Sequence, residues 1–203
     1  GRDPVRPVRD FLYLMVLAKQ AQQPALVVID NVIEGGAFAY CQELIANTLK
    51  AGTPVLHLLD DCRTGELRAE WKSRSAQLNL HFQDYPDWER VIEGIQPGSI
   101  LINNIYSYRR PMDFLHWLGN PAMLKEIPVH IALHDFLMLC PRLFLIDSER
   151  KYCGLPESTI CNQCYSRLPL DFPGGAHTIT EWRMSWEKVF ARAETLVAFS
   201  NST

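Results

Sequence analysis

Apolar and polar residues follow one another along this chain in a pattern that predicts alternating strands and helices. Short continuous apolar runs predict strands covered on both faces, and apolar residues recurring every three or four positions predict helices. The predicted strands are residues 25–29, 54–59, 77–82, 99–102, 127–133 and 195–199. The predicted helices are residues 8–22, 37–50, 66–73, 87–94, 111–118 and 180–193. This order favours an α/β domain with a parallel, doubly wound sheet and right-handed crossovers.

Most of the predicted strands end in polar residues. The polar ends are Asp30 with the glycines that follow it, Asp60-Asp61, Asn103-Asn104, His134-Asp135 and Ser200. In doubly wound folds, ligands bind beyond the carboxyl ends of the strands, which lie along one edge of the sheet. The sequence therefore predicts a cleft at that edge.

Gly35 and Gly36 stand between the first predicted strand and the helix at residues 37–50. Glycine lets a ligand approach the backbone, and a helix N-terminus favours an anion such as a phosphate. The turn matches neither the G-x-G-x-x-G fingerprint nor a P-loop. A tight turn that needs glycine for its own geometry explains the pair equally well.

Polar side chains beyond the glycines are candidates for substrate binding or chemistry. His134 could titrate near neutral pH, donate to a developing oxyanion or orient a substrate hydroxyl, although a lone histidine is commonly structural. Asp135 could orient a partner or cap the following turn. Asn103 and Asn104 could bind a ligand or favour a turn, and Arg142 could clamp an anion or be a solvated surface residue. The other histidines show no ligand spacing and are interpreted as structural: His57, His81, His116, His130 and His177.

Four of the six cysteines fall within residues 140–164, with the spacing C-x12-C-x7-C-x2-C. Cys161 and Cys164 form a half-site that could grip one tetrahedral ion, and Cys140 and Cys153 would complete a closed four-sulfur shell. A structural Zn²⁺ is the preferred interpretation, because four thiolates leave no open position for catalysis. An iron–sulfur cluster, a redox pair and free thiols are the alternatives.

Composition narrows the function classes. A net charge of −3 over 203 residues gives no basic surface for nucleic acid, and no apolar run reaches the roughly 18 residues of a membrane span. Residues 1–4 lead into no signal peptide, so we expect a cytoplasmic protein with reduced or metal-bound thiols. Cys41 and Cys62 look unrelated to the group of four. Because the sequence begins without methionine, we expect a fragment of a longer chain.

Four segments resemble GT-B glycosyltransferases of the family-4 type. VVIDNVIEGGAFAYCQELIANTLKAGTPVLHL is similar to their first strand, Gly-Gly loop, helix and second strand, and SILINNIYSY to a strand with an asparagine end. HDFLMLCPRLFLIDSERKYCGLPESTICNQC resembles the His-Asp and cysteine segment of a bacterial subset of the family. AETLVAFSNST is similar to the strand that closes their N-terminal domain.

The resemblance implies half of a GT-B fold, with residues 1–24 as a helical extension and 25–203 as a Rossmann-like acceptor-side domain. A cysteine-rich loop would span residues 136–175. The expected activity is transfer of a sugar from a nucleotide-sugar donor to a glycan or glycoconjugate, as in bacterial polysaccharide biosynthesis. Gly35 and Gly36 correspond to the loop facing donor phosphate and acceptor, and His134 to the histidine at the cleft edge.

A second Rossmann-like domain would hold most of the donor in such an enzyme, usually with a Glu-x7-Glu motif that cannot be placed here. We therefore expect this chain to be inactive alone, and the full-length enzyme to associate peripherally with a membrane. Two rival hypotheses remain. One is a stand-alone α/β ligand-binding or protein-interaction domain with a zinc-stapled loop, and the other is a redox protein that uses Cys161 and Cys164.

Overall fold

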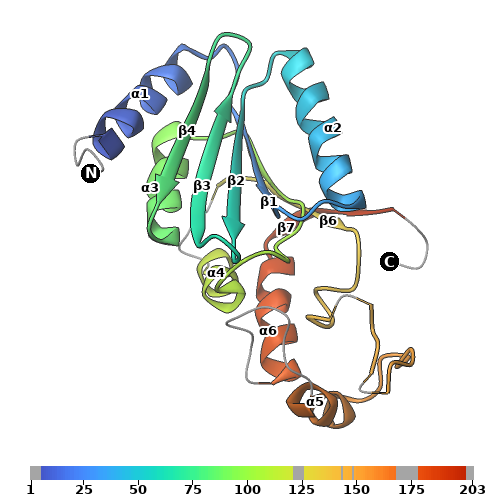
Figure 1. Cartoon of the computed structure of the whole chain (residues 1–203). Coiled ribbons are helices and arrows are strands. Elements are labelled where there is room, and N and C mark those ends of the chain that lie inside the picture. Colours follow the sequence, from blue (N-terminus) through green and yellow to red (C-terminus); the bar gives the residue numbers. More distant parts are fainter. Residues whose placement is uncertain (1–5, 121–125, 143, 148, 168–177, 200–203) are drawn as a thin grey trace.

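The computed structural model describes residues 6–120, 126–142, 144–147, 149–167 and 178–199 (Figure 1). Its helices are α1 (Arg6–Gln20), α2 (Gly36–Ala51), α3 (Tyr85–Ile95), α4 (Pro111–Leu118), α5 (Ser158–Arg167) and α6 (Ile179–Phe190). Its strands are β1 (Leu26–Asp30), β2 (Val55–Asp61), β3 (Glu66–Lys72), β4 (Gln77–Phe82), β5 (Ser99–Ile102), β6 (Val129–Leu133) and β7 (Ala193–Ala198).

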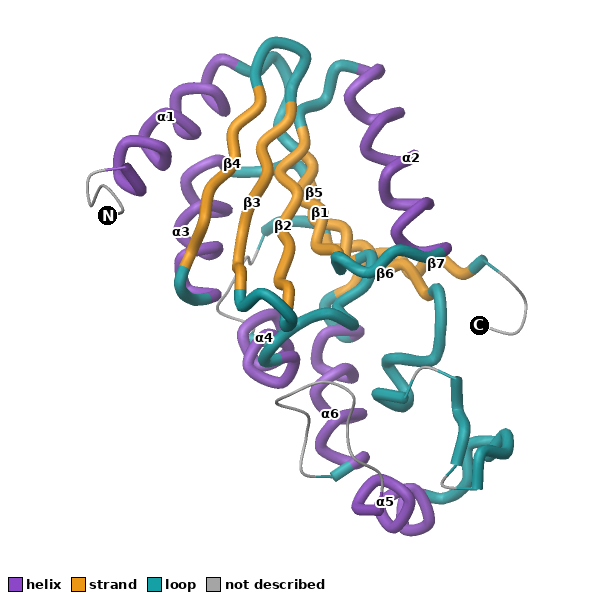
Figure 2. Tube along the Cα trace, viewed as in Figure 1, coloured by secondary structure: helices purple, strands orange, loops and turns teal. Residues whose placement is uncertain are grey.

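The strands form one seven-stranded sheet in the order β4-β3-β2-β1-β5-β6-β7 (Figure 2). From β2 to β7 every neighbouring pair is parallel, whereas β3 pairs antiparallel with both β2 and β4. The α/β class is confirmed, and the arrangement is Rossmann-like. The prediction of an all-parallel sheet was wrong at one edge, where β3 and β4 form an antiparallel extension.

The helix predicted at residues 66–73 was also wrong, because these residues form β3. Leu67, Ala69 and Trp71 are buried, and the residues between them are only partly buried. This alternation has a period of two, which belongs to a strand with one face on the core. A hairpin connection to β2 places this strand antiparallel between β2 and the edge strand β4.

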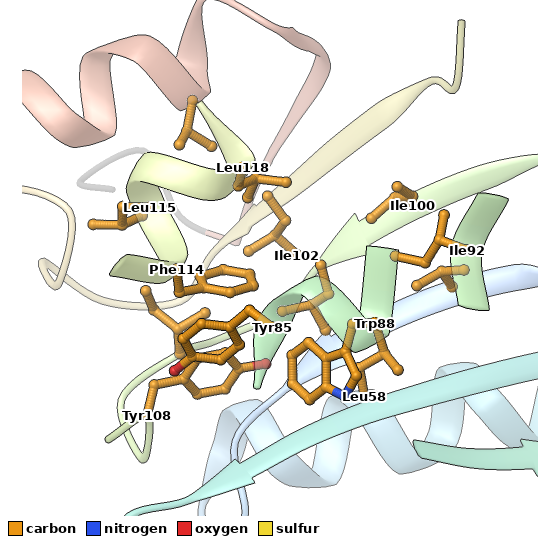
Figure 3. Close-up of a cluster of buried hydrophobic side chains, with 14 of the residues drawn as sticks. Leu58, Tyr85, Trp88, Ile92, Ile100, Ile102, Tyr108, Phe114, Leu115 and Leu118 are labelled. Carbon is orange, nitrogen blue, oxygen red and sulfur yellow. The ribbon is translucent and has the colours of Figure 1, made fainter. Parts of the chain in front are cut away.

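The two faces of the sheet are covered unequally. Val27 and Ile29 of β1 point into a large core shared with α1, α3, α4 and α6, and Figure 3 shows the aromatic part of that core. On the opposite face, α2 encloses a cluster of only four buried apolar residues: Val28, Cys41, Ile45 and Val55. The α2 face thus buries far fewer apolar residues than the other face does.

The described part of the segment between β6 and α6 lies beyond one end of the sheet, next to α6 (Figure 1). It contains an isolated bridge between Ile146 and Tyr152 and the helix α5, which the sequence pattern did not predict. Ser200 and residues 168–175 of the expected cysteine-rich loop lie outside the described residues. Among the helices that the structure describes, none combines the length and apolar character needed to cross a bilayer.

Candidate functional site at the carboxyl ends of the parallel strands

Three of the predicted strand-end residues form one hydrogen-bonded chain across β1, β5 and β6. The Asn103 side-chain amide donates to Asp30 Oδ1 over 2.8 Å and to the Ala37 carbonyl over 3.0 Å. The Asn103 carbonyl oxygen lies 2.7 Å from Nε2 of His134. The register of the parallel strands brings these side chains together, as the sequence predicted.

This chain fixes the protonation pattern of His134. A carboxylate and a backbone carbonyl can only accept, so Asn103 must turn its NH₂ group toward Asp30 and Ala37. Its oxygen therefore faces His134, and Nε2 must donate to it. In the neutral ring Nδ1 then carries the lone pair, and none of the described residues donates a hydrogen bond to it.

Two aromatic rings hold the His134 imidazole. Phe199 stacks on it with ring centroids 4.4 Å apart and planes 10° apart, and Tyr40 of α2 meets it edge-on at 5.2 Å. Burial lowers the pKa of His134, an effect that the negative charges of Asp135 and Asp30 oppose. The ring is therefore neutral at pH 7, with an available acceptor at Nδ1. Sequence reasoning missed Tyr40, although it lies one helical turn after Gly36.

Asp135 and Asn104 support the loop that follows β6. Asp135 Oδ1 accepts from the backbone N–H of Leu137 over 2.8 Å, and its Oδ2 accepts from the Asn104 amide over 3.1 Å. The Asn104 oxygen accepts from the Tyr106 backbone at 2.8 Å. The structure thus places Asp135 as a turn cap, and Asn103 and Asn104 as buried residues that bond within the protein.

Asp60 does not face a cleft either. It is fully buried, and its carboxylate accepts from the Arg109 Nε over 2.7 Å and from the Tyr85 hydroxyl over 2.6 Å. Asp61 caps its own turn by accepting from the backbone of Arg63. These two strand-end carboxylates brace the loops around β2.

Gly35 and Gly36 are exposed at the first turn of α2, beside the end of β1. Neither has a positive φ that only glycine tolerates, and an added Cβ at either position would meet no atom within 4 Å. No side chain caps the helix at Gly35. The fold itself therefore gives no reason for glycine here, and the tight-turn interpretation loses its physical basis.

The four clustered cysteines line one cavity of about 300 Å³ between α5, α6 and the preceding segment, and Arg142 and Arg183 line it too. Burial raises the pKa of the Cys140 thiol, and the thiols of the other three raise it further. The Nη1 group of Arg142 is buried without a hydrogen-bond partner, and Arg183 Nη2 lies 3.5 Å from the Cys161 sulfur. Arg142 therefore belongs to this cavity and not to the strand-end site.

These residues fit a four-thiolate ion in composition. Four thiolates around Zn²⁺ carry a net charge of −2, which two adjacent guanidinium groups would offset. The sulfurs of such a shell lie about 3.8 Å apart, and no three of the four cysteines hold their sulfurs within 4.8 Å of one another. They would have to draw together around an ion.

Among the described residues, one group of three side chains has its donor atoms within 4.8 Å of one another and could hold a metal ion. The group consists of Asp30, Cys41 and His57. Sequence reasoning missed it, because the three lie far apart in the chain and His57 shows no ligand spacing. The pairing of β1 with β2, in which Val28 stands opposite His57, and the buried face of α2, which carries Cys41, bring them together.

The strand-end site therefore offers an open glycine turn at a helix N-terminus and a neutral, oriented histidine with one available acceptor. Such a site can receive an anionic group at the glycines and a hydroxyl at His134. Comparisons with known protein families, with curated proteins and with solved structures found no match to this chain.

Proposed function

We propose that this chain is the acceptor-side half of a GT-B glycosyltransferase, which transfers a sugar from a nucleotide-sugar to a glycan or glycoconjugate acceptor. The observation that carries the proposal is the Gly35-Gly36 turn. Its glycines are not needed by the fold, yet they stand at the carboxyl end of β1 beside the His134 chain. Glycines of this kind are explained by a ligand that approaches the backbone closely.

In this proposal, the glycine turn faces the donor phosphates and the acceptor. His134 accepts a hydrogen bond from the reacting hydroxyl of the acceptor at Nδ1, and Asn103 holds its ring in place. No carboxylate nucleophile is assigned, because Asp30, Asp60 and Asp135 are all committed to bonds within the protein. A second Rossmann-like domain would supply most of the donor site.

Gly36→Ala tests this proposal most directly. An added methyl should leave the free energy of unfolding unchanged or raise it by up to about 1 kcal/mol, because alanine favours the helix. In the full-length enzyme the same methyl should lower transfer by roughly 10-fold or more, about 1.4 kcal/mol of lost transition-state binding. Transfer would be measured with UDP-glucose, UDP-N-acetylglucosamine and GDP-mannose as donors.

Gly65→Ala is the matched control for Gly36→Ala. Gly65 has a φ of +72°, so alanine there is strained, by about 1 kcal/mol. It should lower stability and leave transfer intact, which is the opposite pattern. A Gly36→Ala enzyme that loses stability but transfers normally would return this turn to a purely structural role.

We further propose that the four-cysteine cavity holds a structural Zn²⁺, with Cys140, Cys153, Cys161 and Cys164 as ligands. The described part of the segment between β6 and α6 lies beyond the end of the sheet (Figure 1). A bound ion would contribute folding free energy there. It would thereby hold the loop after His134 at the rim of the site.

Replacing Cys161 and Cys164 together with serine should lower the zinc content by one ion per chain, because two of the four ligands are lost. The measurement is elemental analysis of protein expressed with added zinc. Cys62→Ser, which changes a cysteine outside the cavity, should leave the zinc content unchanged. Equal zinc in all three proteins would rule out this site, and an iron signal would favour a cluster.

A further inference from the structure

Three donor atoms of different chemistry converge beneath α2. His57 Nε2 lies 3.4 Å from Asp30 Oδ2 and 3.9 Å from the Cys41 sulfur, and all three atoms lie within 4.8 Å of one another. Asp30 and Cys41 are fully buried, and His57 is 2% exposed. They come from three elements, β1, α2 and β2.

The spacing is close to that around a tetrahedral zinc ion. Usual zinc bond lengths place a carboxylate oxygen and an imidazole nitrogen about 3.3 Å apart, and a nitrogen and a thiolate sulfur about 3.6 Å apart. The observed separations of 3.4 and 3.9 Å exceed these by about 0.1 and 0.3 Å. Small shifts of the side chains would accommodate an ion.

The outer oxygen of Asp30 already has a hydrogen-bond partner, as is usual around metal ligands. Asp30 Oδ1 accepts from Asn103 over 2.8 Å, while its inward Oδ2 is buried and has no hydrogen-bond partner. His57 Nδ1 has no hydrogen-bond partner, and the nearest carboxylate oxygen, from Glu70, lies 3.8 Å away and pairs with Lys72 over 2.9 Å. Asp30 Oδ2 faces His57 Nε2 at 3.4 Å without a hydrogen bond, and a cation bound between the two atoms would be a partner for both.

We propose that Asp30, Cys41 and His57 bind one divalent transition-metal ion, with Zn²⁺ as the best match. A mixed set of oxygen, nitrogen and sulfur donors suits Zn²⁺, whereas Mg²⁺ and Ca²⁺ prefer oxygen alone. The ion ties α2 to β1 and β2 on the face where only four apolar residues are buried. This assignment does not depend on sugar transfer or on the four-cysteine cavity.

Cobalt uptake tests the site, since Co²⁺ replaces Zn²⁺ and its bond to a thiolate absorbs in the near ultraviolet. The chain carrying Cys161→Ser and Cys164→Ser is expressed in zinc-depleted medium with Co²⁺, because the buried site must be filled during folding. One Co²⁺ per chain with this absorption is expected. Adding Cys41→Ser should remove both signals, and adding Cys62→Ser should remove neither.

Two results would overturn the proposal. In the first, the chain carrying Cys161→Ser and Cys164→Ser folds but takes up no Co²⁺. In the second, the absorption remains after Cys41→Ser is added. The first result would indicate that His57 is instead an imidazolium between Asp30 and Glu70. Should the cysteine variants fail to fold, Glu70→Gln on the partly exposed face of β3 replaces them. It should weaken Co²⁺ binding by about 10- to 100-fold, while Glu66→Gln on the same strand should not, and equal affinities would count against the site.

Discussion

Replacing Asp60 with alanine is expected to lower the free energy of unfolding by about 3 kcal/mol. Breaking a buried ion pair from one side costs about 3–5 kcal/mol, because the remaining charge stays buried without a partner. The lower end applies here, since the Arg109 side chain is 25% exposed and can recruit water. The Tyr85 hydroxyl, which donates to Asp60 over 2.6 Å, loses its acceptor at the same time.

Asp61→Ala provides the comparison, because the neighbouring carboxylate pairs with an arginine side chain that is 63% exposed. Exposed pairs contribute about 1 kcal/mol or less, and the lost bond from the Arg63 backbone adds roughly 0.5–1 kcal/mol. Urea denaturation should therefore separate the two variants by about 1–2 kcal/mol. Equal losses would mean that the buried position of Asp60 adds nothing. The loop that carries Arg109 would then be held mainly by its backbone bonds.

Asp60 also marks where the sequence prediction of a cleft was too broad. A polar residue at the end of a buried strand can face a ligand or can bind another loop, and the chain pattern is the same for both. The Arg109 partner lies 49 positions away. Its approach depends on the path of the loop after β5, which local periodicity does not encode.

The central strands were predictable because both faces of each are covered. Residues 25–29 and 100–102 are continuous apolar runs, and β1 and β5 lie within a residue of them. β3 was missed because alternating residues such as Arg68 and Glu70 gave its segment a polar appearance. Its buried positions, Leu67, Ala69 and Trp71, carry the period of two that would have identified a strand.

The candidate site likewise has a part that could be predicted from the sequence and a part that could not. The Asp30, Asn103 and His134 chain could be predicted, because residues at the carboxyl ends of neighbouring parallel strands must share an edge. The Asp30, Cys41 and His57 group could not, because it needs the β1–β2 register and the face of α2 that is buried. Phe199 was likewise beyond prediction, since its contact with His134 requires β7 to lie beside β6.

His134→Ala is expected to lower sugar transfer by about 10²-fold or more in the full-length enzyme, which corresponds to about 2.7 kcal/mol at the transition state. The physical reason is the loss of Nδ1, an oriented acceptor that no described residue already occupies. Thermal unfolding should be measured beside transfer, because Phe199 and Tyr40 also lose a packing partner. His116→Ala, which removes an exposed histidine from α4, should change neither quantity.

The pH dependence separates chemistry from packing. Because burial holds the pKa of His134 below its usual value of about 6.5, the ring is neutral at pH 7 and Nδ1 accepts. Transfer should therefore be constant above pH 6.5 and fall as the pH drops through the lowered pKa, where Nδ1 gains a proton and becomes a donor. Stability should change in the same direction, since the unfolded chain binds that proton more readily.

His134→Gln is the control for the pH dependence. Glutamine keeps a donor for Asn103 but does not titrate, so the residual transfer of this variant should no longer fall at acidic pH. If transfer by His134→Gln still falls at acidic pH, another group is responsible for the fall and His134 has no part in the chemistry.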